Sequence, residues 1–473
     1  MKLSLGLRLY IIELPQKQLS NREPTMHKST QVYFKQQIEN FRRSFFQTND
    51  LPFKQIFSTK IIRKINDTGN GRHKIYTPLI TLKAFLFQVL SDDASCKEVV
   101  ARILAGRLQH ELPANSLNTG PYCKARQRLV LEHLIEAVCS TGRTLIQRSG
   151  HWNWKGFHVV MADGSTVIMS DTPDNQRAFP QQSNQKQGLG FPIARMVTLI
   201  SLNVGTVLDY AVGAYQGKGT GETTLLSSLL KNLNQGHLLL ADRYYCTYAI
   251  VSHLLNANVA VVFRNHANKK ADFRRGIKLG PKDHLIDWHK PPRKPVWMSE
   301  ASYAALPEVI QVREFSSAGV VYVTTLIDHK RYAKKEVADL YQQRWKIELD
   351  LRSIKTHMGM EKLRCLSSEM IKKEIAVYFL AYNLIRTNLA QAAYLHNKNP
   401  RELSFKATVQ LVIHSSAQLL QITGVALKNA LSYLFKAIAS TPVGQRKRNK
   451  QPRAVKRRPK AYPLLTIPRH KYC

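Results

Sequence analysis

A series of short β-branched and aromatic runs begins after Gly156 and constrains the fold of this chain more than any other feature. Runs of this kind, bounded by turn residues, are typical of β-strands. The predicted strands cover residues 157–161, 167–169, 194–202, 207–212 and 237–241. A helix is predicted at residues 221–232, and the loop with Gly217, Gly219 and Gly221 before it is interpreted as a turn. Strands that alternate with a helix indicate the α/β fold class.

Helical periodicity replaces this pattern on the N-terminal side of the strands. The predicted helices cover residues 81–89, 96–108 and 122–147. Basic side chains at the start of the third helix favour an N-terminal DNA-binding module over residues 71–150. A plain helical bundle with a solvated basic face fits the same pattern. Residues 1–70 are basic and polar with weak periodicity, so no element is predicted there.

Three further segments complete the predicted organisation. Residues 259–327 contain strand-like pieces separated by prolines, which predicts a β-rich insertion inside a strand-rich domain of residues 151–365. Helical periodicity then predicts a helical region over residues 366–440. Residues 441–473 form a basic tail, in which positions 445–460 hold nine Lys or Arg and two prolines. This composition is typical of a disordered arm that contacts phosphates without reading a base sequence.

The charge of the chain indicates the kind of partner it binds. It has 70 Lys and Arg against 32 Asp and Glu, a formal net charge of +38. Self-repulsion of this size in a compact protein needs a polyanion or counterions to offset it, so nucleic acid is the expected partner. An anionic membrane surface is the alternative, but the basic residues are spread through the chain instead of forming one amphipathic helix.

Cysteine usage and apolar runs argue against a membrane protein. The six cysteines are scattered without a CxxC pair, which predicts reduced thiols and no structural zinc site. The longest apolar run beyond the N-terminal segment, residues 376–385, is too short to span a bilayer. A cytoplasmic location without membrane association is therefore expected.

Two aspartates are predicted at strand ends. Asp163 follows the strand at residues 157–161 closely, and Asp242 comes directly after the strand at residues 237–241. Acids at strand ends converge at the carboxyl edge of an α/β sheet, where ligands usually bind. Either aspartate taken alone is more often an ordinary turn residue.

A third acid, Glu348, lies on a predicted helix with two distinct faces. At about 100° per residue, one face holds Tyr341, Arg344, Glu348, Arg352 and Lys355. Beside it runs an apolar stripe of Leu340, Ile347, Leu351, Ile354 and Met358. The helix is predicted to pack through the stripe and to present the polar face. Solvated ion pairs of Glu348 with Arg344 or Arg352 are the alternative.

Three acids on so basic a chain suggest a divalent metal. DNA phosphate chemistry needs positive charge at both the attacking and the leaving oxygen, which two ions roughly 4 Å apart provide. Mg²⁺ suits such a site because it keeps several waters and takes only one or two carboxylates per ion. Two Mg²⁺ ions are expected, with Mn²⁺ as a substitute. Oxygen ligands from two strands and one helix are sufficient for them.

At these residues the chain resembles one large family of bacterial DDE transposases, the insertion-sequence-4-like family. The family's Y-R-E-K signature is matched by Tyr341, Arg344, Glu348 and Lys355. The phrases MADGST around Asp163 and LLADRYY around Asp242 resemble its first and second acidic motifs, in the same order. The likeness covers roughly residues 70–465 and includes the β-rich insertion.

The resemblance implies an RNase H-like catalytic core in which Asp163, Asp242 and Glu348 are the metal ligands. It also implies phosphate contacts near the scissile bond from Tyr341, Arg344 and Lys355, with Arg352 on the same face. In members of the family, a tryptophan of the insertion stacks on a base flipped out of a DNA hairpin. The candidates here are Trp288 and Trp297, and a buried structural role is the alternative for each.

The function that the resemblance implies is cut-and-paste transposition of an insertion sequence by metal-dependent strand cleavage and strand transfer. Its partners are the element ends and target DNA, and a homodimer acts on paired ends at the bacterial nucleoid. An RNase H-like nuclease without strand transfer is one alternative. A catalytically inactive DNA-binding protein derived from a transposase is another.

Overall fold

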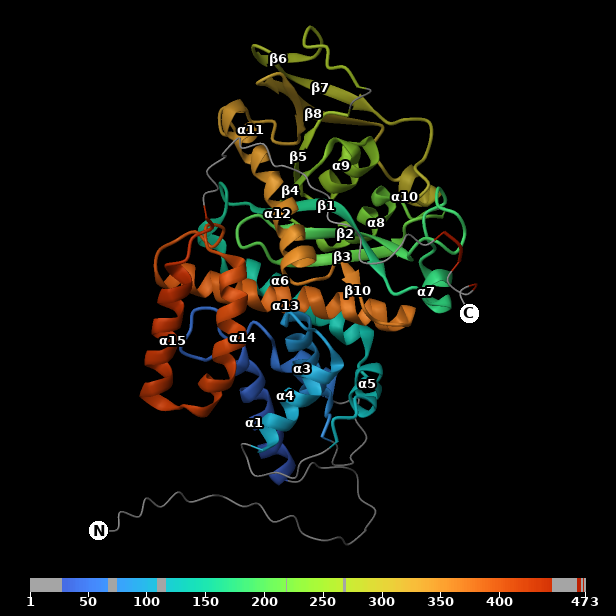
Figure 1. Ribbon diagram of the computed structural model, residues 1–473. Helices are drawn as coiled ribbons and strands as arrows, with labels where there is room; N and C mark the ends of the chain where they lie inside the picture. Colours follow the sequence, from blue (N-terminus) through green and yellow to red (C-terminus); the bar gives the residue numbers. More distant parts are fainter. Residues whose placement is uncertain are drawn as a thin grey trace, which may run out of the picture.

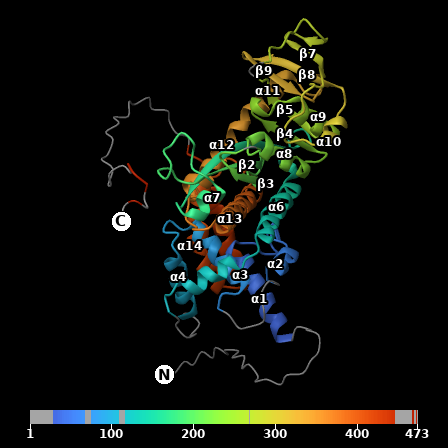
Figure 2. The same ribbon diagram turned by 90° about the vertical axis from the view of Figure 1, so that its right-hand side faces the viewer.

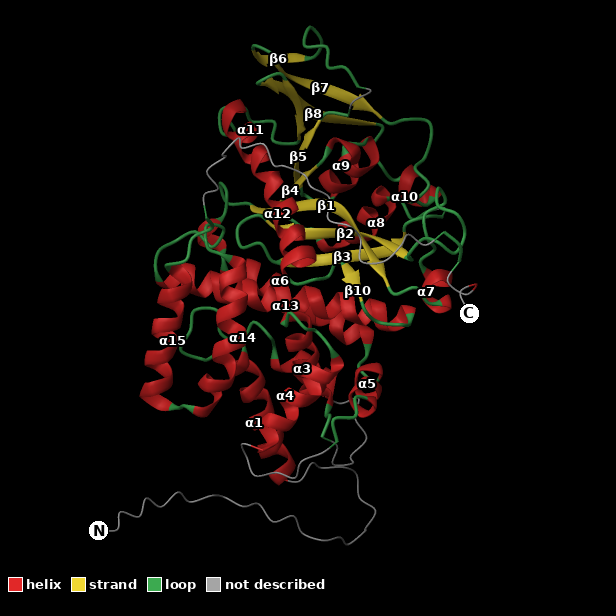
Figure 3. Cartoon of the chain, viewed as in Figure 1, coloured by secondary structure: helices red, strands yellow, loops and turns green. Residues whose placement is uncertain are grey.

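The structure is a computed structural model that describes residues 28–66, 75–108, 116–217, 219–266, 269–444, 466–468 and 471. The first 27 residues and the predicted basic arm at positions 445–460 lie outside the described residues. A mixed β-sheet occupies the upper half of the molecule, and helices from both ends of the chain form the lower half (Figure 1). Figure 3 shows the same division, with the yellow strands gathered in the upper half.

Five strands form the core of the sheet, in the order β3-β2-β1-β4-β5. Their bounds are His158–Met169 for β1, Ile193–Ser201 for β2, Val207–Ala214 for β3, His237–Ala241 for β4 and Ala260–Arg264 for β5. β1, β2 and β3 pair antiparallel, whereas β4 and β5 run parallel to β1. This order and these directions are those of an RNase H-like core, so the predicted fold class is confirmed.

Strand β1 joins two predicted strands into one of 12 residues. The residues between the two predicted runs continue the pairing, since Asp163 lies opposite Thr198 and Gly164 lies opposite Val197 of β2. Asp163 therefore lies within β1. Pairing with β2 extends the strand through this polar stretch. The residue pattern of one segment does not show such pairing.

Helices surround the sheet and lie below it. Those of the N-terminal part are α1 (Lys28–Ser44), α2 (Thr59–Asn66), α3 (Pro78–Leu90), α4 (Cys96–Leu108), α5 (Gly120–Gln127) and α6 (Leu131–Arg148). Those between strands are α7 (Pro173–Ala178), α8 (Glu222–Leu229), α9 (Tyr248–Asn256), α10 (Glu300–Ala304), α11 (Lys334–Gln342) and α12 (Lys346–Arg352). The C-terminal helices are α13 (Ser368–Leu395), α14 (Phe405–Gln421) and α15 (Gly424–Ala439).

The two faces of the core sheet belong to two separate hydrophobic clusters. Val159 and Met161 of β1 pack into the larger cluster, which includes side chains of α12 and α13. Val160 and Ala162 pack into the second cluster, which includes side chains of α8 and α9. Successive residues of a strand point to opposite faces, so α12 and α8 cover opposite faces of β1.

The predicted β-rich insertion extends the core sheet. It comprises β6 (Ile277–Gly280), β7 (Asp283–His289), β8 (Val309–Ser317) and β9 (Val320–Thr324), together with α10. β9 pairs with β5, so the strands continue the sheet away from the helical half, as Figure 2 shows from the side. β5, which the sequence grouped with the insertion, pairs with β4 in the core.

Two N-terminal helices, α1 and α2, lie where the sequence predicted no element. Their core residues are concentrated in the C-terminal half of α1, where Ile38 and Phe41 are buried, and in α2, where Ile62 is buried. This clustering hides the helical period from a window of polar sequence. The helix predicted at residues 122–147 is two helices, because the chain turns between α5 and α6.

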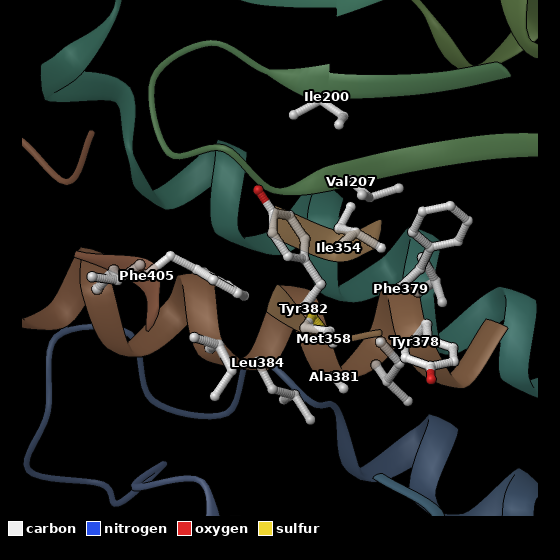
Figure 4. Packing of buried hydrophobic residues seen from close by; sticks show 14 of the residues in the cluster. Ile200, Val207, Ile354, Met358, Tyr378, Phe379, Ala381, Tyr382, Leu384 and Phe405 are labelled. Atoms are coloured by element: carbon white, nitrogen blue, oxygen red, sulfur yellow. The ribbon is translucent and has the colours of Figure 1, made fainter. Parts of the chain in front are cut away.

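Helix α13 connects the sheet to the helical half of the molecule. Figure 4 shows Phe379 and Tyr382 of α13 on the side of the helix that faces Val207 of β3, with Ile354 between them. Most of α13 is buried all round, since helices also cover its other side. Among the described helices, none has both the length and the apolar character that crossing a bilayer requires.

Candidate active site

The pairing of β1 with β4 places the first two predicted acids side by side. Ala162 of β1 lies opposite Ala241 of β4 in parallel register, so Asp163 and Asp242 are the next residues on the two chains. Neighbouring strands lie about 4.8 Å apart. The two aspartates are therefore adjacent where β4 ends, as their positions relative to the predicted strands led us to expect.

The helix that carries Glu348 packs on β1 through the predicted apolar stripe. All five stripe residues are buried: Leu340, Ile347, Leu351, Ile354 and Met358. The polar face of this segment does not follow one continuous α-helix. A 3₁₀ turn at Gln343–Trp345 separates α11 from α12, and a π turn at Ser353–His357 follows α12. These turns shift Tyr341 and Lys355 away from the positions that a constant 100° step predicts.

Arg344 connects the helix to the strand acids. Its guanidinium lies 3.4 Å from Oδ2 of Asp163 and 3.5 Å from Oε1 of Glu348. The side chains of Arg344, Asp163 and Glu348 are 15%, 22% and 38% exposed. The Arg344–Glu348 pair is therefore part of a half-buried group and not a solvated surface ion pair.

The protonation of Asp163 reflects this environment. Burial raises the pKa of its carboxyl group, and the negative charges of Glu348 and Glu222 raise it further. The guanidinium of Arg344 and the backbone N–H of Gly164 oppose this rise in pKa, the latter through a hydrogen bond. The net direction is upward, so the folded protein disfavours the ionised form of this carboxyl group, and an added cation would favour it.

Asp242 belongs to the same electrostatic group. Burial acts to lower the pKa of the Arg344 guanidinium, but the surrounding Tyr341, Asp163, Asp242 and Glu348 raise it above its usual value. Arg344 thus interacts electrostatically with all three predicted acids. Asp163, Asp242 and Glu348 are separated by 79 and 106 positions in the chain, and the fold brings them to the same guanidinium.

Tyr341 lies in the same group but is 9% exposed. Its ring packs edge-on against Tyr322 of β9, with 5.2 Å between the ring centroids. Burial raises the pKa of its phenol to about 12, so the hydroxyl stays protonated near neutral pH. A protonated phenol at this position is able to donate a hydrogen bond to a phosphate oxygen.

The remaining cations of the polar face extend beyond the acids. Arg352 is exposed at the end of α12, and Lys355 is half-buried in the π turn. They continue the positive charge of Arg344 along the helix.

The two predicted tryptophans differ in exposure. Trp288 of β7 is 6% exposed, and its indole N–H donates a 2.9 Å hydrogen bond to Glu314. The ammonium of Lys269 lies 3.1 Å from the centre of its ring. The burial and contacts of Trp288 favour the structural role that was its alternative. Trp297 is partly buried at the edge of the same hydrophobic cluster and keeps part of its surface open.

One acid near the site, Glu222 at the start of α8, is not predicted from the sequence. It contacts Gly164 on β1 and accepts a 3.2 Å hydrogen bond from the hydroxyl of Tyr245. The residues before it were interpreted only as a glycine-rich turn. An acid in the first turn of a helix that follows a strand was the available signal, because helix N-termini in α/β folds adjoin the ligand edge of the sheet.

The donor set of this site fits a hard divalent cation. Among the described residues, no three Asp, Glu, His or Cys side chains already converge as a metal-binding group, and Arg344 bridges two of the predicted acids. The acids around it offer only carboxylate oxygens, which are the protein ligands that Mg²⁺ and Mn²⁺ prefer. No thiol or imidazole among them favours a softer metal.

Comparison with known proteins agrees with this geometry. Residues 154–384 match the family model described as a transposase DDE domain, and this range contains the three acids and the Y-R-E-K positions. The chain is also 27% identical over 372 residues to the transposase InsG of insertion sequence element IS4 from Escherichia coli K12, covering 76% of this chain and 82% of that protein. The chain belongs to the DDE transposases of insertion sequences.

The comparisons also match another insertion-sequence protein and a solved structure. The putative transposase InsL of insertion sequence element IS186A from Escherichia coli K12 is 30% identical over 135 residues, 28% of this chain and 34% of that protein. A cryo-EM structure of the piggyBac transposase synaptic complex with hairpin DNA aligns over 86% of both chains, with 10% identity and a TM-score of 0.41. As a DDE transposase, the chain is an enzyme that cleaves and transfers DNA strands and depends on divalent metal.

Proposed function

We propose that Asp163, Asp242 and Glu348 hold two Mg²⁺ ions with which this transposase cuts its element from one DNA site and joins it to another. The observation that carries the proposal is the arrangement around Arg344. A register between parallel strands makes Asp163 and Asp242 neighbours, and one guanidinium reaches both Asp163 and Glu348. Two ions supply positive charge to the attacking and leaving oxygens and activate water or a 3′-hydroxyl.

The cations of the helix position the scissile phosphate in this proposal. Arg344 exchanges a carboxylate for a phosphate oxygen, since a guanidinium forms paired hydrogen bonds to either group. The hydroxyl of Tyr341 donates to the same phosphate, and Lys355 and Arg352 neutralise the next phosphates along the strand. The half-buried setting of Arg344 strengthens these contacts, because water screens them less than at an open surface.

Other surfaces hold the rest of the DNA. The open side of Trp297 stacks on a base displaced from the duplex, which offsets part of the unstacking cost. The basic N-terminal helices contact the element end, and the basic tail adds phosphate contacts that weaken with salt. Two copies act together on paired ends as a homodimer, and the protein works in the cytoplasm at the nucleoid.

A strand-transfer assay tests this function. The assay supplies precut element ends, target DNA and Mg²⁺, and it separates a transposase from a nuclease that only cleaves and from an inactive DNA-binding protein. The variants Asp163→Asn, Asp242→Asn and Glu348→Gln are expected to lose cleavage and joining but to keep end binding. The exposed acid Asp339 of α11 provides the matched control, and Asp339→Asn is expected to keep both activities. Retained cleavage in any of the first three variants would contradict the proposal.

A further inference from the structure

The carboxylate of Glu222 occupies the space where residue 164 would otherwise have a side chain. A Cβ built on Gly164 would lie 2.5 Å from the carboxyl carbon of Glu222 and 2.6 Å from its Oε1. Such distances are too short for a real contact, so a side chain at residue 164 would have to displace the Glu222 carboxylate. Gly164, the residue after Asp163, therefore leaves space for the carboxylate of a further acid, Glu222, at the active site.

A hydrogen bond ties Glu222 to the turn that carries Asp242. Tyr245 lies three residues after Asp242 and is 1% exposed. Its hydroxyl donates to Oε2 of Glu222 at 3.2 Å. Glu222 is also the first residue of α8, and the N-terminal end of a helix stabilises a negative charge. The side chain is thus fixed in place by a strand on one side and a buried phenol on the other.

Glu222 and Glu348 approach Asp163 from opposite faces of β1. Glu348 comes from α12, which packs with Val159 and Met161 in the larger hydrophobic cluster. Glu222 comes from α8, whose side chains pack with Val160 and Ala162 in the other cluster. Glu348 shares the guanidinium of Arg344 with Asp163, and the carboxylate of Glu222 lies beside Gly164, the residue after Asp163. One glutamate therefore lies on each side of β1 at residues 163 and 164.

We propose that Glu222 is a fourth metal-holding carboxylate of this transposase, on the opposite side of Asp163 from Glu348. The inference rests on the proposed two-metal site. Two divalent ions carry four positive charges, which three carboxylates leave partly unbalanced, whereas four carboxylates match them. Asp163 and Asp242 would contribute carboxylate oxygens to both ions, with Glu348 as a further ligand from its side of β1 and Glu222 as a further ligand from the other side. Oxygen ligands on both sides of Asp163 would suit two ions roughly 4 Å apart.

A purely structural role is the alternative, in which Glu222 only satisfies the buried hydroxyl of Tyr245. Three variants separate the two roles. Glu222→Gln keeps the size of the side chain and an oxygen that accepts from Tyr245, but it removes the charge. Tyr245→Phe removes the hydrogen bond and keeps the charge. Gly164→Ala changes no charge, but its methyl group displaces the Glu222 carboxylate from the space that it occupies.

Binding of Mn²⁺ to the full-length protein without DNA is the direct test, followed through the electron paramagnetic resonance signal of free Mn²⁺. Glu222→Gln and Gly164→Ala are expected to weaken Mn²⁺ binding by about tenfold or more, and Tyr245→Phe by less. Glu132→Gln is the matched control, because it removes the same charge from the first turn of another helix, α6. Its Mn²⁺ affinity is expected to equal that of the wild type.

The outcome distinguishes this inference from the proposed function. If Asp163→Asn loses Mn²⁺ affinity while Glu222→Gln binds as the wild type does, Glu222 is structural and the three-acid site stands. If Asp163→Asn also binds normally, the proposed metal site itself is wrong. Thermal unfolding of each variant identifies loss of fold. Should Glu222→Gln unfold, Gly164→Ala gives the same test, because unchanged Mn²⁺ affinity in a folded Gly164→Ala protein would overturn the inference.

Discussion

The guanidinium of Arg344 lies 3.4 Å from the carboxylate of Asp163, a residue 181 positions earlier in the chain. The same guanidinium lies 3.5 Å from Glu348, one helical turn away. A single cation thus connects an acid of the central strand with the acid of the packed helix. The position of Arg344 therefore depends on the fold of both elements. An incoming phosphate competes with these two carboxylates for its guanidinium.

Replacement of Arg344 tests whether this cation acts on DNA. Arg344→Ala is expected to lower the cleavage rate on the order of 100-fold, because one preorganised donor near developing negative charge is worth that much. Arg344→Lys should recover only part of the loss, since an ammonium cannot form the paired hydrogen bonds of a guanidinium. Single-turnover cleavage of labelled end DNA measures both rates. Full recovery by lysine would show that charge alone matters and would contradict a paired phosphate contact.

Asp350 is expected to support the helix that carries Glu348. It is 1% exposed and accepts hydrogen bonds from Arg386, Arg401 and the hydroxyl of Tyr382. Asp350→Ala leaves two mostly buried guanidinium groups without their counter-charge, which costs about 3–5 kcal/mol. Urea unfolding of the full chain measures this loss.

The exposed Asp339 is the control for Asp350. Asp339→Ala on the adjoining helix α11 should change the free energy of unfolding by no more than about 0.5 kcal/mol. Equal stability of the two alanine variants would mean that the buried network around Asp350 contributes nothing to holding α12.

The two tryptophans of the insertion are expected to respond differently to substitution. Trp288→Phe loses the buried hydrogen bond to Glu314 and the contact with Lys269, so it should lower the melting temperature. Trp297→Ala should leave the melting temperature nearly unchanged and slow the steps that need a displaced base. Melting curves and cleavage of an end with a 2-aminopurine reporter compare the two variants. A normal reporter signal in Trp297→Ala would remove Trp297 from the proposed DNA surface.

The sequence predicted the acids of the site better than the elements around them. Asp163 and Asp242 were found because each follows an apolar run, and the helix of Glu348 because its stripe is regular. Helices α1 and α2 were missed because their buried residues are clustered, with Phe41 and Phe45 near the end of α1. These helices depend on tertiary packing for their stability, and local periodicity does not report such packing.

Glu222 was missed for a different reason. Its role depends on a contact across the fold, with Gly164 on β1, and on a hydrogen bond from Tyr245. The strand pairing that brings these residues together cannot be derived from their spacing in one sequence. The same is true of the burial of Trp288, which depends on the pairing of β7 with β8. Sequence patterns therefore located residues with a local signature, and the structure was needed for residues defined by their neighbours.

The ionisation of Asp163 predicts an opposing effect on stability and activity. Burial raises the pKa of Asp163 in the folded protein above its value in the unfolded chain. Folding then favours the protonated form, so ionised Asp163 destabilises the folded protein above the folded-state pKa, and this penalty disappears as the pH falls below the unfolded value of about 4. Asp163→Asn mimics the protonated form, and Arg344 keeps Glu348 as a partner.

Asp163→Asn should therefore raise the melting temperature by up to a few degrees at pH 8 while it abolishes cleavage. The difference from the wild type should shrink steadily as the pH is lowered towards 4, because the wild-type carboxyl group becomes protonated as well. Melting curves across this pH range measure the effect, with Asp339→Asn as an exposed control. A lower melting temperature for Asp163→Asn at pH 8 would show that the ion pair with Arg344 outweighs the cost of burying the carboxylate.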